Sequence, residues 1–355
     1  MKFFTLLITL STLFSFATTI VTTTMAATTT HTSQDKVVYF YNWTEYLPDD
    51  VIKDFEKETG IKVIYSTYDN NEAMYAKIKM QKENPYDIVV PSGYFVKKMV
   101  EAKLLQKIDQ KKLNNFKNLD PDLLNKSFDP KNQYTIPYFW GSTVIAVNKT
   151  KIDPNQIKSF KDLWKKEFKN KVLLLNDMRE VFFISLKTLK LNGNTKNESE
   201  IKKAYENLLQ LKPNIKAFDS DSPKTAFLAG EVAIGAIWNG EIFQAMKENR
   251  DISYIIPKEG AFFYLDNLAI PYNARNVENA YKLINFILRA DIAKRIAMAV
   301  GYASPNLAAR KLLPKEIANN PLIYPEKNLV KSGDFQDDVG DALQIYQRYF
   351  EKLKL

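Results

Sequence analysis

Between residues 37 and 105, short apolar segments rich in Val, Ile and Tyr alternate with longer amphipathic segments. The apolar segments predict β-strands and the amphipathic ones predict α-helices. The strands are expected at 37–41, 62–68 and 87–90, and the helices at 49–59, 71–82 and 95–105. Strands that alternate with helices usually pair in parallel, because each helix carries the chain back across one face of the sheet. This region therefore predicts an α/β fold with a parallel sheet.

A second alternating series follows a polar connection at 114–132. Its strands are expected near 134–147, 172–175, 232–237 and 252–256, with helices between them, and the region from Val277 onward has a mostly helical pattern. With 355 residues, the chain is long enough for one large domain or two lobes. The alternation by itself indicates two consecutive halves.

The N-terminal segment has the pattern of a secretory signal. Lys2 precedes an apolar stretch from Phe3 to Val21 that is diluted by Thr and Ser, and small residues follow around Met25. A signal peptide is therefore expected at 1–27, followed by a Thr-rich leader at 28–35. An uncleaved membrane anchor is the alternative, although the Thr and Ser content disfavours a stable span.

The chain has no cysteine, and its one histidine, His31, lies in the Thr-rich leader. This composition excludes disulfides and thiolate nucleophiles, and it leaves the folded body without Ser-His-Asp catalysis or the common zinc sites. The sequence also lacks the Gly-rich loops that hold phosphates or dinucleotides, and it lacks a Gly-x-Ser-x-Gly motif. We therefore expect a binding protein rather than an enzyme, with no metal and no cofactor.

The formal net charge is +9, and Lys2 is the only charged residue of the expected signal peptide, so its removal leaves about +8. The Lys residues are scattered among Asp and Glu, as in KDFEKETG and KKAYENLLQ, and form no basic block. This distribution is typical of solvated helix faces. The sequence therefore predicts no nucleic-acid partner.

Aromatic and acidic residues recur where the expected strands end. In an open parallel sheet, ligands bind beyond the carboxyl ends of the strands. The residues that fall there, or between the two apolar runs of AFFYLDNLAIP, are Trp43, Thr44, Glu45, Tyr46, Ser92, Tyr94, Asp177, Glu180, Trp238, Tyr264 and Asp266. Aromatic rings offer cation–π faces and cover methylene groups, while carboxylates accept protons from ammonium groups. Such a lining suits an extended organic cation.

Several of these residues also have purely local explanations. Asp177 and Glu180 fit a helix capping box, in which Glu180 reaches back to the start of the helix. Trp43 and Trp238 fit ordinary packing aromatics. Asp266 stands in an apolar stretch and needs a partner, which is either a ligand or an Arg or Lys of the fold. Tyrosine clusters also bind ferric iron, but the acids and tryptophans fit a cation with a hydrocarbon body better.

With these residues collected, the chain resembles the periplasmic spermidine/putrescine-binding proteins of bacterial ABC importers, the PotD type, from about Lys36 to Leu355. The motifs that carry the resemblance are YFYNWTEYLP, ETGIKVIYSTY, YDIVVPSGYFV, IPYFWGSTVIAVN, DMREVF, IWNGE, LDNLAIP, GYASPNLAARKLL and GDFQDDVG. None of them suffices alone, but all nine occur in the same order.

The resemblance implies a class II periplasmic binding protein, in which two α/β lobes close over the ligand cleft at a hinge. One lobe is expected to hold 36–141 and 265–310, and the other 142–264 and 311–355, which replaces the two consecutive halves. The resemblance further implies a monomer of the periplasm that captures spermidine or putrescine and delivers it to an inner-membrane ABC permease.

The family's ligand contacts fall on Trp43, Thr44, Tyr46, Ser92, Tyr94, Asp177, Glu180, Trp238, Tyr264, Asp266, Tyr302 and Gln336. Glu45 is a neighbouring acid that tunes the field of the cleft. Two positions depart from the family pattern: Tyr264 stands where spermidine-preferring members have Trp, and Gly93 stands where a small hydroxyl residue is usual.

The resemblance also assigns roles to these residues. Asp177, Glu180 and Asp266 supply one carboxylate for each positive charge of spermidine. Trp238 and Tyr264 are expected to sandwich its methylene chain. A periplasmic polyamine sensor that docks on a membrane signalling protein would have the same cleft and is the alternative. A ferric- or anion-binding relative on the same fold is a weaker one.

Overall fold

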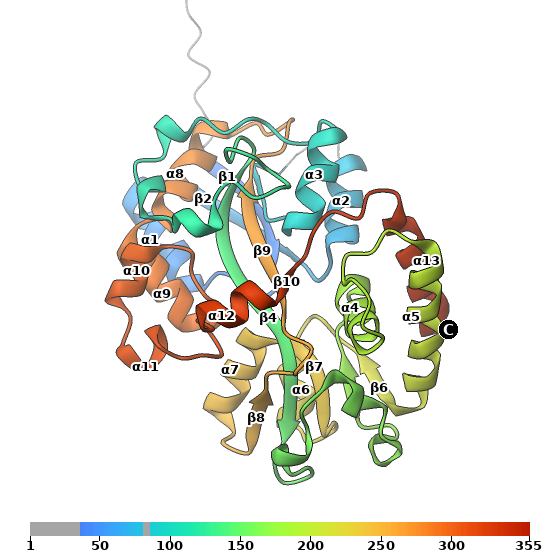
Figure 1. The fold of residues 1–355 in the computed structure, drawn as a ribbon. Helices are drawn as coiled ribbons and strands as arrows, with labels where there is room; N and C mark the ends of the chain where they lie inside the picture. Colours follow the sequence, from blue (N-terminus) through green and yellow to red (C-terminus); the bar gives the residue numbers. More distant parts are fainter. Residues whose placement is uncertain (1–35, 81–85) are drawn as a thin grey trace, which may run out of the picture. The chain divides into compact units, whose positions relative to one another are not determined.

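The computed structural model describes residues 36–80 and 86–355 (Figure 1). The expected signal peptide and leader at 1–35 therefore lie outside the described residues. The strands are β1 (Val37–Trp43), β2 (Lys62–Tyr68), β3 (Ile88–Val89), β4 (Thr135–Asn148), β5 (Val172–Leu174), β6 (Ile215–Phe218), β7 (Ile234–Trp238), β8 (Ile252–Ile255), β9 (Phe262–Ala269) and β10 (Asp334–Phe335).

The helices are α1 (Asp49–Thr59), α2 (Asn71–Met80), α3 (Gly93–Glu101), α4 (Met178–Thr188), α5 (Glu198–Leu211), α6 (Pro223–Leu228), α7 (Asn239–Glu248), α8 (Val277–Ile287), α9 (Ala290–Val300), α10 (Leu307–Leu312), α11 (Lys315–Ala318), α12 (Lys327–Ser332) and α13 (Ala342–Lys354). Among the residues that the structure describes, no helix combines the length and the apolar character needed to cross a membrane.

The first predicted elements agree closely with the structure. α1 occupies the predicted residues and ends at Gly60, whose φ of 68° lies in the left-handed region that glycine adopts without strain. β2 also has the predicted bounds. β1 continues two residues further than predicted, so Trp43 is its last residue and not part of the following loop. α3 begins earlier than predicted, so Tyr94 lies in its first turn.

All ten strands belong to one mixed sheet with the order β2-β1-β3-β9-β4-β7-β5-β6, to which β10 adds at β9 and β8 adds at β4. β1 pairs in parallel with β2 and β3, as predicted. β5 pairs in parallel with β7 and with β6, a strand that the sequence pattern did not predict. The prediction of a parallel sheet is wrong at the centre, where β4 is antiparallel to β7, β8 and β9. The alternation of strands and helices could not reveal this, because β9 enters the sheet from a distant part of the sequence.

β4 and β9 run side by side through the middle of the sheet (Figure 1). β4 has 14 residues and is buried along its whole length. Its register with β9 runs from Thr135 opposite Ala269 to Thr143 opposite Phe262. β9 is likewise buried at every position. A charged residue on β9 must therefore find its partners inside the protein.

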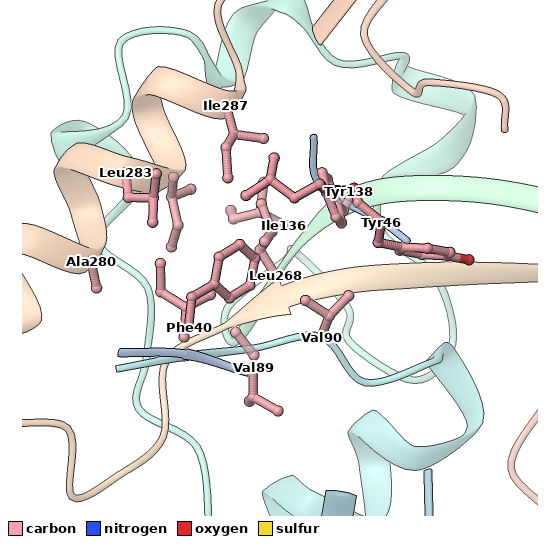
Figure 2. Packing of buried hydrophobic residues seen from close by; sticks show 14 of the residues in the cluster. Phe40, Tyr46, Val89, Val90, Ile136, Tyr138, Leu268, Ala280, Leu283 and Ile287 are labelled. Carbon is pink, nitrogen blue, oxygen red and sulfur yellow. Dashed lines mark hydrogen bonds between the residues drawn. The ribbon is translucent and has the colours of Figure 1, made fainter. Parts of the chain in front are cut away.

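One buried apolar cluster joins the sheet to α8. Its members come from 38–139 and 264–302. Figure 2 shows Leu283 and Ile287 of α8 directed at Phe40, Ile136 and Leu268 of the sheet. Two further clusters draw most of their members from 140–263 and from the chain beyond 303. The sheet therefore connects apolar cores that are each built from separate segments of the chain.

Asp87 ties β1 to the segment that leads into α8. Its buried carboxylate accepts hydrogen bonds from the backbone N–H groups of Tyr39 at 2.9 Å, Arg275 at 3.0 Å and Asn276 at 2.8 Å. The Asn276 side-chain amide adds a fourth at 3.1 Å. Each of these donors would lose its partner if the carboxylate were removed.

We therefore predict that Asp87→Ala lowers the free energy of unfolding by at least about 2 kcal/mol, because it leaves several buried donors unpaired. Urea denaturation measures this change. Asp251, which is exposed, offers a control, and Asp251→Ala should alter stability by no more than about 0.5 kcal/mol. A loss for Asp87→Ala as small as that of the control would contradict the assigned role.

Candidate functional site

A cavity lies where β1 and β7 end and where β9 passes beneath the first turn of α4. Its lining residues are Trp43, Tyr46, Ser92, Asp177, Glu180, Trp238, Tyr264, Asp266 and Gln336. Nine of the twelve residues that the sequence singled out as ligand contacts are therefore gathered around one space. The other three, Thr44, Tyr94 and Tyr302, lie beside this lining rather than on it.

Asp266 lies in the middle of β9, with both carboxylate oxygens engaged. Ser92 Oγ donates to Oδ1 at 2.5 Å, and Tyr46 Oη donates to Oδ2 at 2.8 Å. Burial raises the pKa of Asp266 to about 7, although the two hydroxyl groups partly offset this rise. The partner expected from the fold was an Arg or Lys, and this expectation is wrong. No ion pair involves Asp266 within the described residues.

Asp177 and Glu180 open α4. Asp177 is the N-cap residue, and its Oδ1 accepts from the backbone N–H groups of Arg179 at 2.8 Å and Glu180 at 3.2 Å. The predicted capping box is correct for Asp177 but wrong for Glu180, which does not reach back to the start of the helix. Glu180 instead accepts a hydrogen bond at 2.7 Å from Gln336 Nε2. This contact crosses from α4 to the chain after β10, which no local pattern encodes.

The second oxygen of Glu180 is buried and has no hydrogen bond of ordinary geometry within the described chain. The Thr143 hydroxyl and the Trp238 indole nevertheless lie near enough to lower its pKa. Burial outweighs them, and together with the charge of Asp177 it raises the pKa of Glu180 well above the usual value. Burial also raises the pKa of Asp177. Each of these carboxylates would be stabilised by a cation in the cavity.

A buried arginine holds the segment that carries Gln336. Nη1 of Arg179 donates to the Asp337 carbonyl at 2.9 Å, and Nη2 donates to Asn194 Oδ1 at 2.6 Å. The guanidinium carbon lies 5.4 Å from the ring centroids of both Tyr94 and Tyr346. Arg179 thus binds backbone and aromatic faces. Within the described chain it forms no ion pair with the cavity carboxylates, although its charge acts to lower the pKa of Asp177 and Glu180.

Aromatic rings surround the carboxylates. Trp43 and Trp238 meet edge to face with centroids 6.1 Å apart, and Trp43 is fixed by a 2.9 Å hydrogen bond from Nε1 to the Val90 carbonyl. The ring centroid of Tyr264 lies 6.4 Å from that of Trp238 and 6.3 Å from that of Tyr302. These rings form apolar walls between charged groups, as an extended organic cation requires.

Both departures from the family pattern have a physical explanation. The Tyr264 hydroxyl lies 3.3 Å from Asn239 Oδ1 and would be 2.3 Å from a Cβ atom at Gly141. Glycine at 141 therefore makes room for the hydroxyl of this tyrosine. A Cβ atom at Gly93 would lie 2.4 Å from the Phe128 ring. The ring of Phe128 thus fills the space that a serine at 93 would need.

The sequence analysis missed two residues beside the site, Asn71 and Glu72 at the start of α2. Asn71 Nδ2 lies 3.1 Å from both Ser92 Oγ and Tyr94 Oη. One carboxylate oxygen of Glu72 is buried without a hydrogen-bond partner among the described residues. Burial and the charge of Asp177 raise the pKa of Glu72 to about 8. An acid in a first helical turn is common, so local sequence contains little signal for this role.

The described residues contain no group of three or more acidic or histidine side chains that could hold a metal ion. The arrangement instead offers carboxylates that lack cationic partners, together with aromatic walls. This chemistry favours recognition of a cation that carries several ammonium groups along a hydrocarbon chain.

Comparison with known proteins identifies the family. Residues 50–325 match the bacterial extracellular solute-binding proteins. The chain belongs to this family. The spermidine/putrescine-binding periplasmic proteins of Salmonella typhimurium and Escherichia coli are each 53% identical to it over 324 residues, which cover 91% of this chain and 93% of the relative.

A solved structure supports the same assignment. The spermidine/putrescine ABC transporter substrate-binding protein from Streptococcus pneumoniae superposes with a TM-score of 0.76 at 37% identity, covering 90% of this chain and 98% of that one. The expected fold, the α/β architecture of class II periplasmic binding proteins, is therefore confirmed.

The raised pKa of Asp266 predicts a pH dependence of stability. Asp has a pKa of about 3.9 in an unfolded chain, whereas burial raises that of Asp266 to about 7 in the folded protein. The folded state therefore binds this proton more tightly. The resulting stability is fully present below the unfolded pKa and is lost as pH rises through about 7.

We predict that Asp266→Asn removes part of the loss in melting temperature of the free protein between about pH 4.5 and pH 8. Thermal unfolding across this range measures the effect. Asp251→Asn on the surface should follow the wild-type profile. An Asp266→Asn profile parallel to the wild type would show that this carboxyl does not titrate as stated.

Proposed function

We propose that this solute-binding protein captures the polyamines spermidine and putrescine outside the cytoplasm and delivers them to an ABC importer of the inner membrane. The observation that carries the proposal is the cluster of Asp177, Glu180 and Asp266, three buried carboxylates that form no ion pair in the described chain. The charge of Arg179 acts to lower the pKa of Asp177 and Glu180, but burial outweighs it. The names of the relatives at 53% identity support it. The Streptococcus pneumoniae protein is named an ABC transporter substrate-binding protein, which favours transport over the sensing alternative.

Each charge of the ligand has a counterpart in the site. Asp266 is proposed to bind one ammonium group, and Asp177 with Glu180 to bind the others of spermidine. The edges and faces of Trp238 and Tyr264 are proposed to cover the methylene chain, with Trp43 and Tyr46 framing one end. Thr44, Ser92, Tyr94, Tyr302 and Gln336 complete the proposed set, as hydrogen-bonding or packing groups around the ammonium positions.

The same proposal includes two lobes, 36–141 with 265–310 and 142–264 with 311–355, that close on the ligand. One apolar cluster supports this division, because all of its buried members except Tyr264 come from 36–141 and 265–310. β4 and β9 would carry the hinge, since both strands pass through the middle of the sheet. We further propose a monomeric protein of the periplasm that performs no catalysis.

Calorimetric titration with spermidine and putrescine tests the proposed ligand class, and Asp266→Asn tests its main ionic partner. Loss of a charge-assisted contact in a desolvated cleft should cost about 2–4 kcal/mol of spermidine binding energy. Tight binding of ferric iron with no binding of either polyamine would contradict the proposal. Unchanged spermidine affinity in Asp266→Asn would contradict the role of this residue.

Glu180→Gln tests whether the third carboxylate serves the third charge. We predict a larger loss of affinity for spermidine than for putrescine, because putrescine carries one charge fewer. The melting temperature of the free protein should not fall, since Asp177 rather than Glu180 caps α4. An equal loss for both ligands would assign Glu180 a general role. A lower melting temperature would indicate a structural one.

A further inference from the structure

A second cavity, of 370 Å³, lies between α12 and β4, where the helix crosses the strand (Figure 1). Residues within 120–126, Trp140 and Arg310 line it from one of the proposed lobes, and residues within 325–330 together with Phe335 line it from the other. We call this cavity the hinge pocket. Its volume is typical of sites that bind small molecules.

The hinge pocket and the polyamine cavity lie on opposite faces of β9. Tyr264 and Asp266 line the polyamine cavity, and Phe263 points to the other face because side chains alternate along a strand. The centroid of the Phe263 ring lies 6.2 Å from that of Trp140 and 5.3 Å from that of Phe335. Trp140 and Phe335 in turn line the hinge pocket. The two cavities are therefore back to back across the sheet.

The lining of the hinge pocket carries one excess positive charge. Lys126, Arg310 and Lys327 are its cations, and Asp120 and Asp122 are its acids. Within the described residues, none of the three cations forms an ion pair. Burial lowers the pKa of Lys126, and the charges of Asp122 and Asp120 offset this effect only in part. An anion in the pocket would therefore find cations that the fold leaves without a salt bridge.

Two of these cations are held against aromatic rings. Lys126 Nζ lies 5.1 Å from the centroid of the Phe335 ring. The guanidinium carbon of Arg310 lies 4.0 Å from the centroid of the Tyr324 ring, and its Nε and Nη2 donate to the Ala318 carbonyl at 3.3 and 2.9 Å. Its Nη1 donates no hydrogen bond in the described part of the chain. The arginine is thus fixed in place and retains one donor for a ligand.

We propose that the hinge pocket binds a small organic monoanion with a flat apolar body, an aromatic carboxylate in chemical class, and that its occupation raises the affinity of the protein for polyamines. The rings of Trp140 and Phe335 pack against the body of this ligand. Lys126 and Arg310 bind its carboxylate. The second half of the proposal rests on the proposed function, whereas the first half does not.

The link between the two cavities follows from their shared walls. A ligand that contacts both lobes in the hinge pocket is bound only while the lobes keep their present positions. In these positions Trp43 of one lobe meets Trp238 of the other across the polyamine cavity. Phe335 is also followed directly by Gln336, which binds Glu180. Occupation of the hinge pocket therefore stabilises the polyamine site, and each ligand raises the affinity for the other.

Calorimetric titration of the free protein with 2-naphthoate tests the new site. The neutral analogue 2-naphthamide has the same body, and it should bind about fivefold more weakly because it lacks the ionic contact. Lys126→Met should weaken 2-naphthoate binding by about the same factor. Val330→Trp places a large ring in the pocket and should abolish 2-naphthoate binding. Lys216→Met is the control, because Lys216 is exposed on β6, and it should bind 2-naphthoate like the wild type.

Titration with spermidine, with and without saturating 2-naphthoate, tests the coupling. The wild type should bind spermidine about fivefold more tightly when 2-naphthoate is present. Val330→Trp should bind spermidine with an affinity that does not respond to 2-naphthoate, because its pocket is already filled. Spermidine binding by each variant shows that the variant is folded.

Four results would overturn the inference. The absence of 2-naphthoate binding at millimolar concentration would mean that the cavity is not a site, and unchanged binding by Val330→Trp would place the ligand elsewhere. Equal affinity for 2-naphthoate and 2-naphthamide would contradict the anionic class of ligand. A spermidine affinity that does not respond to 2-naphthoate in the wild type would contradict the coupling. Failure of the proposed function is a different result, in which 2-naphthoate binds and no polyamine does.

Discussion

The site depends on the burial of carboxylates that form no ion pair among the described residues. Within the described chain, Asp266 accepts hydrogen bonds from the hydroxyl groups of Ser92 and Tyr46, and Glu180 accepts one from the Gln336 amide. Neutral donors of this kind satisfy an acid without cancelling its charge. Desolvation then raises the pKa of each acid. A multiply charged cation in the cavity offsets the free-energy cost of burying these carboxylates.

This constraint explains why the acids lie on particular elements. Asp266 is on β9, which is buried at every position and lies between β3 and β4. A buried central strand keeps the carboxylate away from water and fixes its distance from Ser92, with which it forms an isolated bridge. Asp177 uses the N-terminus of α4, where two backbone N–H groups bind one oxygen. Both positions restrict the solvation of the carboxylate.

Local patterns predicted the first helices and strands, since α1 and β2 follow from amphipathic and apolar periodicity and from Gly60. Strand ends also located most of the aromatic and acidic residues of the site. The antiparallel centre of the sheet could not be predicted in this way, because β9 pairs with segments far away in the sequence. For the same reason, the contact of Glu180 with Gln336 and the burial of Glu72 gave no local signal.

The aromatic wall illustrates how the constraint reaches residues that bear no charge. Tyr264 has its hydroxyl near Asn239, in a space that exists because residue 141 is glycine. The ring is therefore anchored at its tip as well as at its backbone, which a larger ring without that hydroxyl could not reproduce. Anchoring fixes the position of the aromatic wall, but it does not distinguish ligands by their number of positive charges. Discrimination between polyamines must then come from the number and spacing of the buried carboxylates.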